Sequence, residues 1–179
     1  MNVASLLLEL YGRIPPVARR AVEGVDLEHL TVPPVPNTNP ISWLIWHIAR
    51  VQDHHVAELL DENQLWVDGD WPHRFGLEPN PANTGYRHTP AEVASLQPDS
   101  PGLLLDYLDA VDGRTRRMLA HLTLADLDSI VDRRWDPPVT MGVRLVSIAG
   151  DGLQHAGQAA YVGACSECEM PLAICRIGG

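Results

Sequence analysis

The sequence contains no lysine, and its 13 basic residues, all arginine, are outnumbered by 23 acidic residues. A nucleic-acid-binding surface needs a basic face to contact phosphates, so the net charge of −10 argues against such a partner. The same charge disfavours binding to anionic lipid. We therefore expect neither nucleic acid nor a membrane surface among the partners.

Long apolar runs are also missing, and no stretch is long enough to cross a bilayer. The opening segment MNVASLLLELYGRIPP lacks the basic region and the small-residue cleavage site of a secretory signal. Its Val3, Leu6, Leu7 and Leu10 recur at helical spacing, which predicts an amphipathic first helix. By default, we expect a cytoplasmic protein.

Cysteine is scarce and confined to the C-terminal tail, where the three residues are Cys165, Cys168 and Cys175. The first two form a CxxC pair, but no second pair exists to complete a structural zinc site. Their clustering in a tail also argues against a disulfide in the core. We interpret them as ordinary thiols.

What the chain does contain suits one packed domain, residues 1–179, because 45% of its 179 residues are hydrophobic and 20% are charged. The pattern predicts an all-α four-helix bundle, with a long loop over residues 67–98 between the second and third helices. Residues 163–179 look poorly helical and atypical. The four predicted helices are Ala4–Val22, Ile41–Glu62, a third that begins at Ser100-Pro101 and ends at Leu122, and Met141–Gly163.

Capping residues mark several of these boundaries. Asn39 is expected to cap the second helix, and Thr140 is expected to cap the fourth. Thr89 and Glu92 have the spacing of a capping box that opens a short helix inside the long loop. The segment DRRWDPPVT before the fourth helix is expected to be a loop.

The segment GDGLQHAGQ in the fourth helix contains the candidate site. Asp151 and His155 are four residues apart, so their side chains lie on one face of the helix. One interpretation is a structural pair in which Asp151 orients His155, with His47 as a lone core histidine. The other is a divalent-metal site, in which His47 from the second helix joins the pair and a coordination position stays open.

Several blocks resemble the DinB-like superfamily: NPISWLIWHIARVQDHHVAEL, WPHRFGL, WDPPVTMGVRL and DGLQHAGQAAYVG. Within it, the chain is most similar to an actinobacterial group related to the metal-binding domain of mycothiol-dependent maleylpyruvate isomerase. Members are four-helix bundles that bind one divalent metal through a histidine of the second helix and a pair on the fourth. The resemblance implies His47, Asp151 and His155 as the metal ligands.

A three-ligand site with an open position can activate water for hydrolysis or bind a thiol as its thiolate. The resemblance favours the thiol, and implies a mycothiol-dependent S-transferase or isomerase that acts on a small electrophile. The alternative is a non-catalytic module that binds metal or thiol. The isomerase's second domain has no counterpart in this chain, and DNA repair is suggested only by the superfamily's name.

Zinc is the expected metal, although nickel, manganese or iron would also suit two imidazoles and a carboxylate. The resemblance further implies a homodimer. Arg74 and Tyr86 of the long loop and Gln158, three residues after His155, are candidate substrate-binding residues.

Two further histidines lie on the second helix. His54, two turns after His47, could face the same cavity, whereas His55 is expected to point elsewhere. We interpret both as structural or surface groups.

Overall fold

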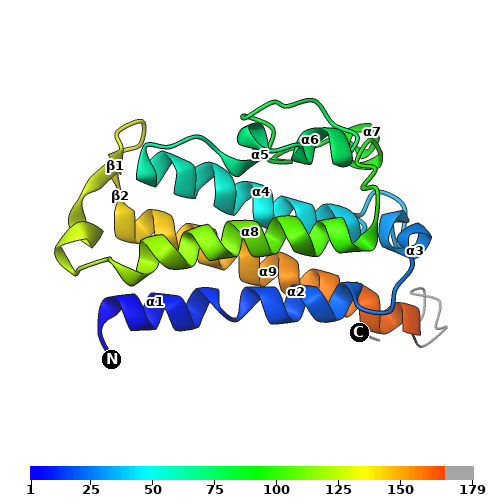
Figure 1. The fold of residues 1–179 in the computed structure, drawn as a ribbon, viewed down its shortest axis with the longest axis horizontal. Helices are drawn as coiled ribbons and strands as arrows, with labels where there is room; N and C mark the ends of the chain where they lie inside the picture. Colours follow the sequence, from blue (N-terminus) through cyan, green and yellow to red (C-terminus); the bar gives the residue numbers. More distant parts are fainter. Residues whose placement is uncertain (168–179) are drawn as a thin grey trace.

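The computed structural model describes residues 1–167, in which four helical rods run side by side along the long axis of the molecule (Figure 1). The second rod packs against the third and the fourth, and the first packs against the fourth. The arrangement confirms the predicted all-α bundle. The rods are α1 (Val3–Tyr11) continued by α2 (Ile14–Val22), α4 (Ile41–Leu60), α8 (Pro101–Ala120) and α9 (Met141–Glu167).

The first rod is broken, so the expectation of one helix from Ala4 to Val22 was wrong. Pro15 and Pro16 follow the break, and they lack the N–H groups that would bond the carbonyls of Tyr11 and Gly12. The proline rings also clash with a preceding helical turn. A new helix therefore starts at Ile14, with both prolines in its first turn.

The predicted caps had mixed outcomes. Thr89 and Glu92 form the expected capping box, which opens α7 (Pro90–Ala94). Thr140 Oγ1 accepts from the Val143 N–H at 3.4 Å, as expected for the start of the fourth rod.

The expected cap of α4 was wrong. Asn39 does not cap this helix, because its N-terminal boundary falls one residue later, at Pro40, which has no side-chain hydrogen bond to offer. At the other end, α4 stops at Asp61, whose backbone takes the left-handed conformation with φ of 54°.

The long connection between α4 and α8 contains three short helices that lie along one side of α4 (Figure 1). They are α5 (Leu65–Asp68), α6 (Trp71–Arg74) and α7. Trp66 and Phe75 from this segment are fully buried in the main core together with Trp46 and Tyr107. The segment is therefore a packed layer over α4 rather than an open loop. A further short helix, α3 (Leu27–Thr31), precedes α4.

The segment before α9 forms a hairpin that the sequence analysis assigned to a loop. After a 3₁₀ turn, η1 (Ala125–Asp128), β1 (Ile130–Asp132) pairs antiparallel with β2 (Val139–Thr140). Asp132 accepts hydrogen bonds from Arg134 and from Arg144 of α9, at 2.8 and 2.9 Å. The bond from Arg144 connects the hairpin to the first turn of α9, and the bond from Arg134 lies within the hairpin.

Helix α9 continues through Glu167, past the predicted end at Gly163, so the expectation of a poorly helical tail was wrong for these first residues. The backbone of Cys165 therefore belongs to α9. Cys168 and Cys175 lie outside the described residues. Among residues 1–167, none of the helices combines the length and the apolar character needed to span a bilayer.

Candidate metal centre

Helix α4 places His47 in the interior, where it faces α9 and is 6% exposed. Trp43, one turn earlier, stacks on the imidazole with ring centroids 4.5 Å apart and an interplanar angle of 12°. His47 Nδ1 lies 2.5 Å from the backbone carbonyl oxygen of Thr84. Because a carbonyl can only accept, Nδ1 carries the proton and Nε2 keeps its lone pair. His47 is thus oriented as a ligand through Nε2.

The Thr84 carbonyl is held in place by an unusually close approach of the loop to α4. Gly85 has a φ of +89°, and a Cβ at this position would lie 2.9 Å from His47 Nδ1 and from ring atoms of Trp43 and Trp46. Only glycine combines this backbone conformation with this spacing. The glycine therefore permits the hydrogen bond that fixes the His47 tautomer.

A fully buried arginine ties the same loop to α4. Arg50 donates to the backbone carbonyls of Asn83 at 3.0 Å and Pro81 at 3.2 Å. Its charge is balanced by buried Asp53, 3.4 Å away. The two loop carbonyls lie just before Thr84, so Arg50 positions the group that orients His47.

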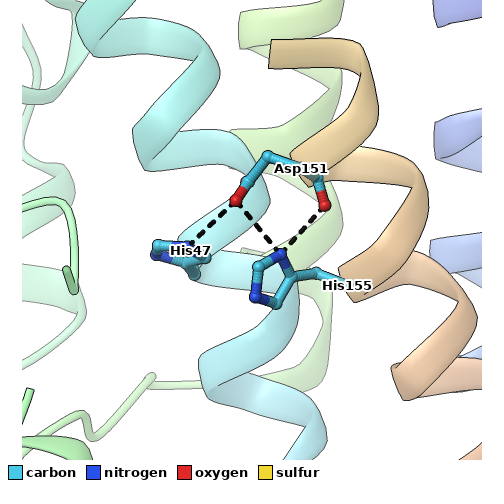
Figure 2. A group of neighbouring side chains, drawn as sticks. All are labelled: His47, Asp151 and His155. Carbon is cyan, nitrogen blue, oxygen red and sulfur yellow. Dashed lines mark hydrogen bonds and ion pairs between the residues drawn. The ribbon is translucent and has the colours of Figure 1, made fainter. Parts of the chain in front are cut away.

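Helix α9 supplies the other two side chains, one turn apart (Figure 2). Asp151 Oδ1 lies 3.8 Å from His47 Nε2 and 3.4 Å from His155 Nδ1. His155 Nδ1 also lies 2.9 Å from the backbone carbonyl of Asp151 and donates to it, so in the neutral ring Nε2 of His155 keeps its lone pair. The two imidazole rings meet edge to face with centroids 4.6 Å apart.

Burial and the neighbouring side chains shift the pKa values of Asp151 and His155. Burial raises the pKa of the Asp151 carboxyl, but its interactions with His155 and His47 outweigh burial, and the pKa falls well below its usual range. Burial lowers the pKa of His155, but Asp151 outweighs this and raises it. Asp151 Oδ2 is nevertheless buried without a hydrogen-bond partner among the described residues. A buried carboxylate oxygen without a partner is unfavourable, and a cation bound at this atom would satisfy it.

The fold of this chain is shared with known proteins. The model of the DinB superfamily matches residues 12–159. The chain belongs to the DinB superfamily. Its structure is also similar to the crystal structure of a conserved protein from Enterococcus faecalis, with 30% sequence identity and a TM-score of 0.86, over 94% of this chain and 99% of that chain. No curated protein matches the chain.

The DinB superfamily is a metal-binding helical fold, and the residues present here fit a divalent cation. One ligand atom from each of His47, Asp151 and His155 lies within 4.8 Å of the others. Two neutral imidazoles and one carboxylate are good ligands for first-row divalent metals. A structural Asp151–His155 pair would account for Oδ1 but leaves Oδ2 without a partner.

A cavity of about 460 Å³ opens beside this group. His47 and Asp151 form part of its wall, and α4, the loop before α7 and the first half of α9 supply the rest. The other lining residues are Val51, His54, His55, Ala82, Thr84, Tyr86, Ser147 and Ile148. The cavity gives this DinB protein room for a small molecule next to the metal ligands.

The structure places the predicted substrate-binding residues in different environments. Tyr86 lines the cavity. Arg74 lies in an exposed ion pair with Asp99, 2.8 Å away, and is not among the residues that line the cavity. Gln158 is exposed on α9, one turn beyond His155. Their substrate-binding roles stay predictions.

Sequence reasoning missed several residues around the cavity. We expected His55 to point away from the cavity. Instead, both His54 and His55 line it, because two successive positions of α4 form part of the cavity wall. The roles of Arg50 and the Thr84 carbonyl were not anticipated. The available signal was a pair of opposite charges, Arg50 and Asp53, three residues apart on a helix whose first half is largely apolar.

Proposed function

We propose that the protein holds one divalent metal through His47 Nε2, His155 Nε2 and the Asp151 carboxylate. The observation that carries this proposal is the buried Asp151 Oδ2 without a partner, next to two imidazoles whose Nδ1 hydrogen bonds leave Nε2 available. Zinc is the first choice because it favours this donor set, while nickel, manganese and iron suit it as well.

We further propose that the metal serves a thiol S-transferase or a thiol-dependent isomerase, with mycothiol as the thiol and a small electrophile as its partner. A bound divalent ion would supply the positive charge that converts a thiol to its thiolate near neutral pH. The cavity beside His47 and Asp151 supports this proposal because it can receive a second molecule. The resemblance to the actinobacterial isomerase group supports mycothiol.

The chain's own residues would do the positioning. Trp43 covers one face of His47, the Thr84 carbonyl holds its Nδ1 proton, and the Asp151 carbonyl holds that of His155. Both imidazoles are thereby kept from rotating or changing tautomer. Val51 and Ile148 make part of the cavity wall apolar.

Removal of one ligand tests the metal site. His47→Ala should weaken metal retention by more than about 100-fold, because even an outer partner of a metal ligand is worth about 10- to 100-fold. His121→Ala is the control, since His121 is an exposed residue at the end of α8. Elemental analysis after dialysis measures both variants and also identifies the metal. Equal retention in the two variants would contradict the ligand assignment.

Turnover is tested separately with the metal-loaded protein, mycothiol and monochlorobimane as a model electrophile. The proposal expects fluorescent conjugate at a rate that depends on the metal and is lost in His47→Ala. If the loaded protein retains metal but conjugates no thiol with any of a panel of electrophiles, the non-catalytic binding module is the correct function.

A further inference from the structure

A second group of metal-ligating side chains lies on α4 beside the cavity: His54, His55 and Glu58. One ligand atom from each falls within 4.8 Å of the others, as in the first group. His54 and His55 line the same cavity as His47 and Asp151. By proximity alone, this group could be a second metal site or part of the site that receives the small molecule.

The hydrogen bonds of Gln64 decide between these two roles. Its Oε1 lies 2.9 Å from Nη2 of the buried Arg50. A guanidinium can only donate, so the atom of Gln64 that faces Arg50 must be the oxygen. The amide nitrogen consequently faces His54 Nδ1, at 3.0 Å. An amide nitrogen is also only a donor, so Nδ1 of His54 must accept and its proton must lie on Nε2.

This tautomer is the reverse of that of His47. In His47 the Thr84 carbonyl keeps the proton on Nδ1 and leaves the Nε2 lone pair for a cation, whereas in His54 the Gln64 amide places the proton on Nε2. A neutral imidazole cannot bind a metal through a protonated nitrogen. A metal at His54 Nε2 would require Gln64 to turn over and give up its bond to Arg50.

The Nε2–H group of His54 is only weakly engaged. Within the described residues, its ion-pair partner is Glu58 Oε1, at 3.5 Å. This distance is longer than the 2.7–3.2 Å of a normal N–H to oxygen hydrogen bond. Glu58 is more closely engaged by His55, whose Nδ1 lies 3.0 Å from Oε2. His54, with a quarter of its side chain exposed, therefore offers a donor with a fixed tautomer at the cavity wall.

We propose that His54 is a substrate-positioning residue, which donates from Nε2 to a carbonyl or carboxylate oxygen of the small molecule in the cavity. The inference rests on the proposed function, since it places the metal at one end of the cavity and His54 farther along it. Seven residues of α4 separate the two histidines, an axial rise of about 10.5 Å. The molecule would thus be an extended one that reaches along the cavity from the metal ligands to His54.

The tautomer itself is tested without any ligand. Long-range ¹H–¹⁵N NMR spectra of the labelled protein above pH 8 should show His54 protonated at Nε2 and His47 protonated at Nδ1. Titration with zinc should saturate at one equivalent and leave the His54 nitrogens unchanged. A His54 protonated at Nδ1, or a second equivalent of zinc bound through His54, would overturn the inference.

The subsite is tested by calorimetric titration of the zinc-loaded protein with mycothiol. His54→Leu should retain zinc and weaken mycothiol binding by about 3- to 10-fold, the size of one neutral hydrogen bond. His54→Gln should restore most of the affinity, because the glutamine amide provides a donor near the position of Nε2, and His121→Leu is the control. Equal affinity in the wild type and His54→Leu would overturn the inference, whereas a wild type that holds zinc but does not bind mycothiol would overturn the proposed function.

Discussion

The carboxylates of Asp53, which is buried, and Asp151, which is half-buried, both lie close to α4, and they differ in how fully their oxygens are satisfied. Asp53 accepts from the backbone N–H groups of Leu65 and Trp66 at 3.0 and 2.8 Å, and from the Tyr107 hydroxyl at 2.9 Å. Asp151 has only the longer contacts of Oδ1 to two imidazoles, and its Oδ2 has no hydrogen-bond partner in the described chain. A complete network is typical of a structural carboxylate, whereas the incomplete one of Asp151 is compatible with the metal-binding role that we propose.

The largest expected effect follows from this difference. Asp53→Ala should lower the free energy of unfolding by about 3–5 kcal/mol, because it leaves the buried Arg50 charge uncompensated. In the metal-free protein, Asp151→Ala should lower the same quantity by less, about 1 kcal/mol, since that side chain is 30% exposed and lies 3.4 and 3.8 Å from its imidazole partners. Urea unfolding of both variants measures the two values. Similar losses would show that Asp151 is as structural as Asp53.

The next effect concerns the loop that orients His47. Gly85→Ala should weaken metal binding by about 10- to 100-fold, because the added methyl group would displace the loop and break the contact to the Thr84 carbonyl. Gly24→Ala is a matched control, since Gly24 also has a positive φ, of +79°, but a Cβ there meets nothing within 4 Å. Competition with a chromogenic chelator measures the affinity. Equal affinities would mean that the loop does not support the site.

The pH dependence of stability should differ between the metal-free protein, in which Asp151 pairs with His155, and the zinc-loaded protein. The pKa of His155 is raised in the folded protein, so the stability that it contributes to the metal-free state is complete below its ordinary value of 6.5. That contribution is lost as the pH rises through the raised value. Metal requires the neutral imidazole, so zinc affinity should fall as the pH drops through the same value, by about tenfold per pH unit for each displaced proton.

Thermal unfolding at a series of pH values from 6 to 9 tests whether zinc affinity falls toward low pH. The difference in melting temperature between the zinc-loaded and metal-free protein should shrink toward low pH. In metal-free Asp151→Asn, the pKa of His155 followed by NMR should be lower than in the wild type, because the carboxylate that raises it is gone. A difference that stays constant across the series would contradict the role of His155.

The bundle and the shared helix face of Asp151 and His155 could be predicted from the sequence because both depend on local spacing. Asp151 and His155 share a face through helical geometry alone, and the resemblance supplied His47 from the facing helix. The carbonyl of Thr84 could not be foreseen, since its position depends on the hydrogen bonds between Arg50 and loop residues about thirty positions later in the chain. The hairpin was missed for a similar reason, because Asp132 bonds to Arg144 in the next helix.

The smallest expected effect belongs to a third carboxylate, on the surface. Asp99 pairs with Arg74 at 2.8 Å, but the side chains are 47% and 38% exposed, so water competes for both. Arg74→Ala should therefore lower the free energy of unfolding by less than about 1 kcal/mol and leave zinc retention unchanged. The same variant tests the predicted substrate-binding role of Arg74, because the loss of a substrate contact would raise the KM for mycothiol while stability stays nearly constant. An unchanged KM would leave the cavity wall, with Tyr86 and His54, as the place where substrate contacts lie.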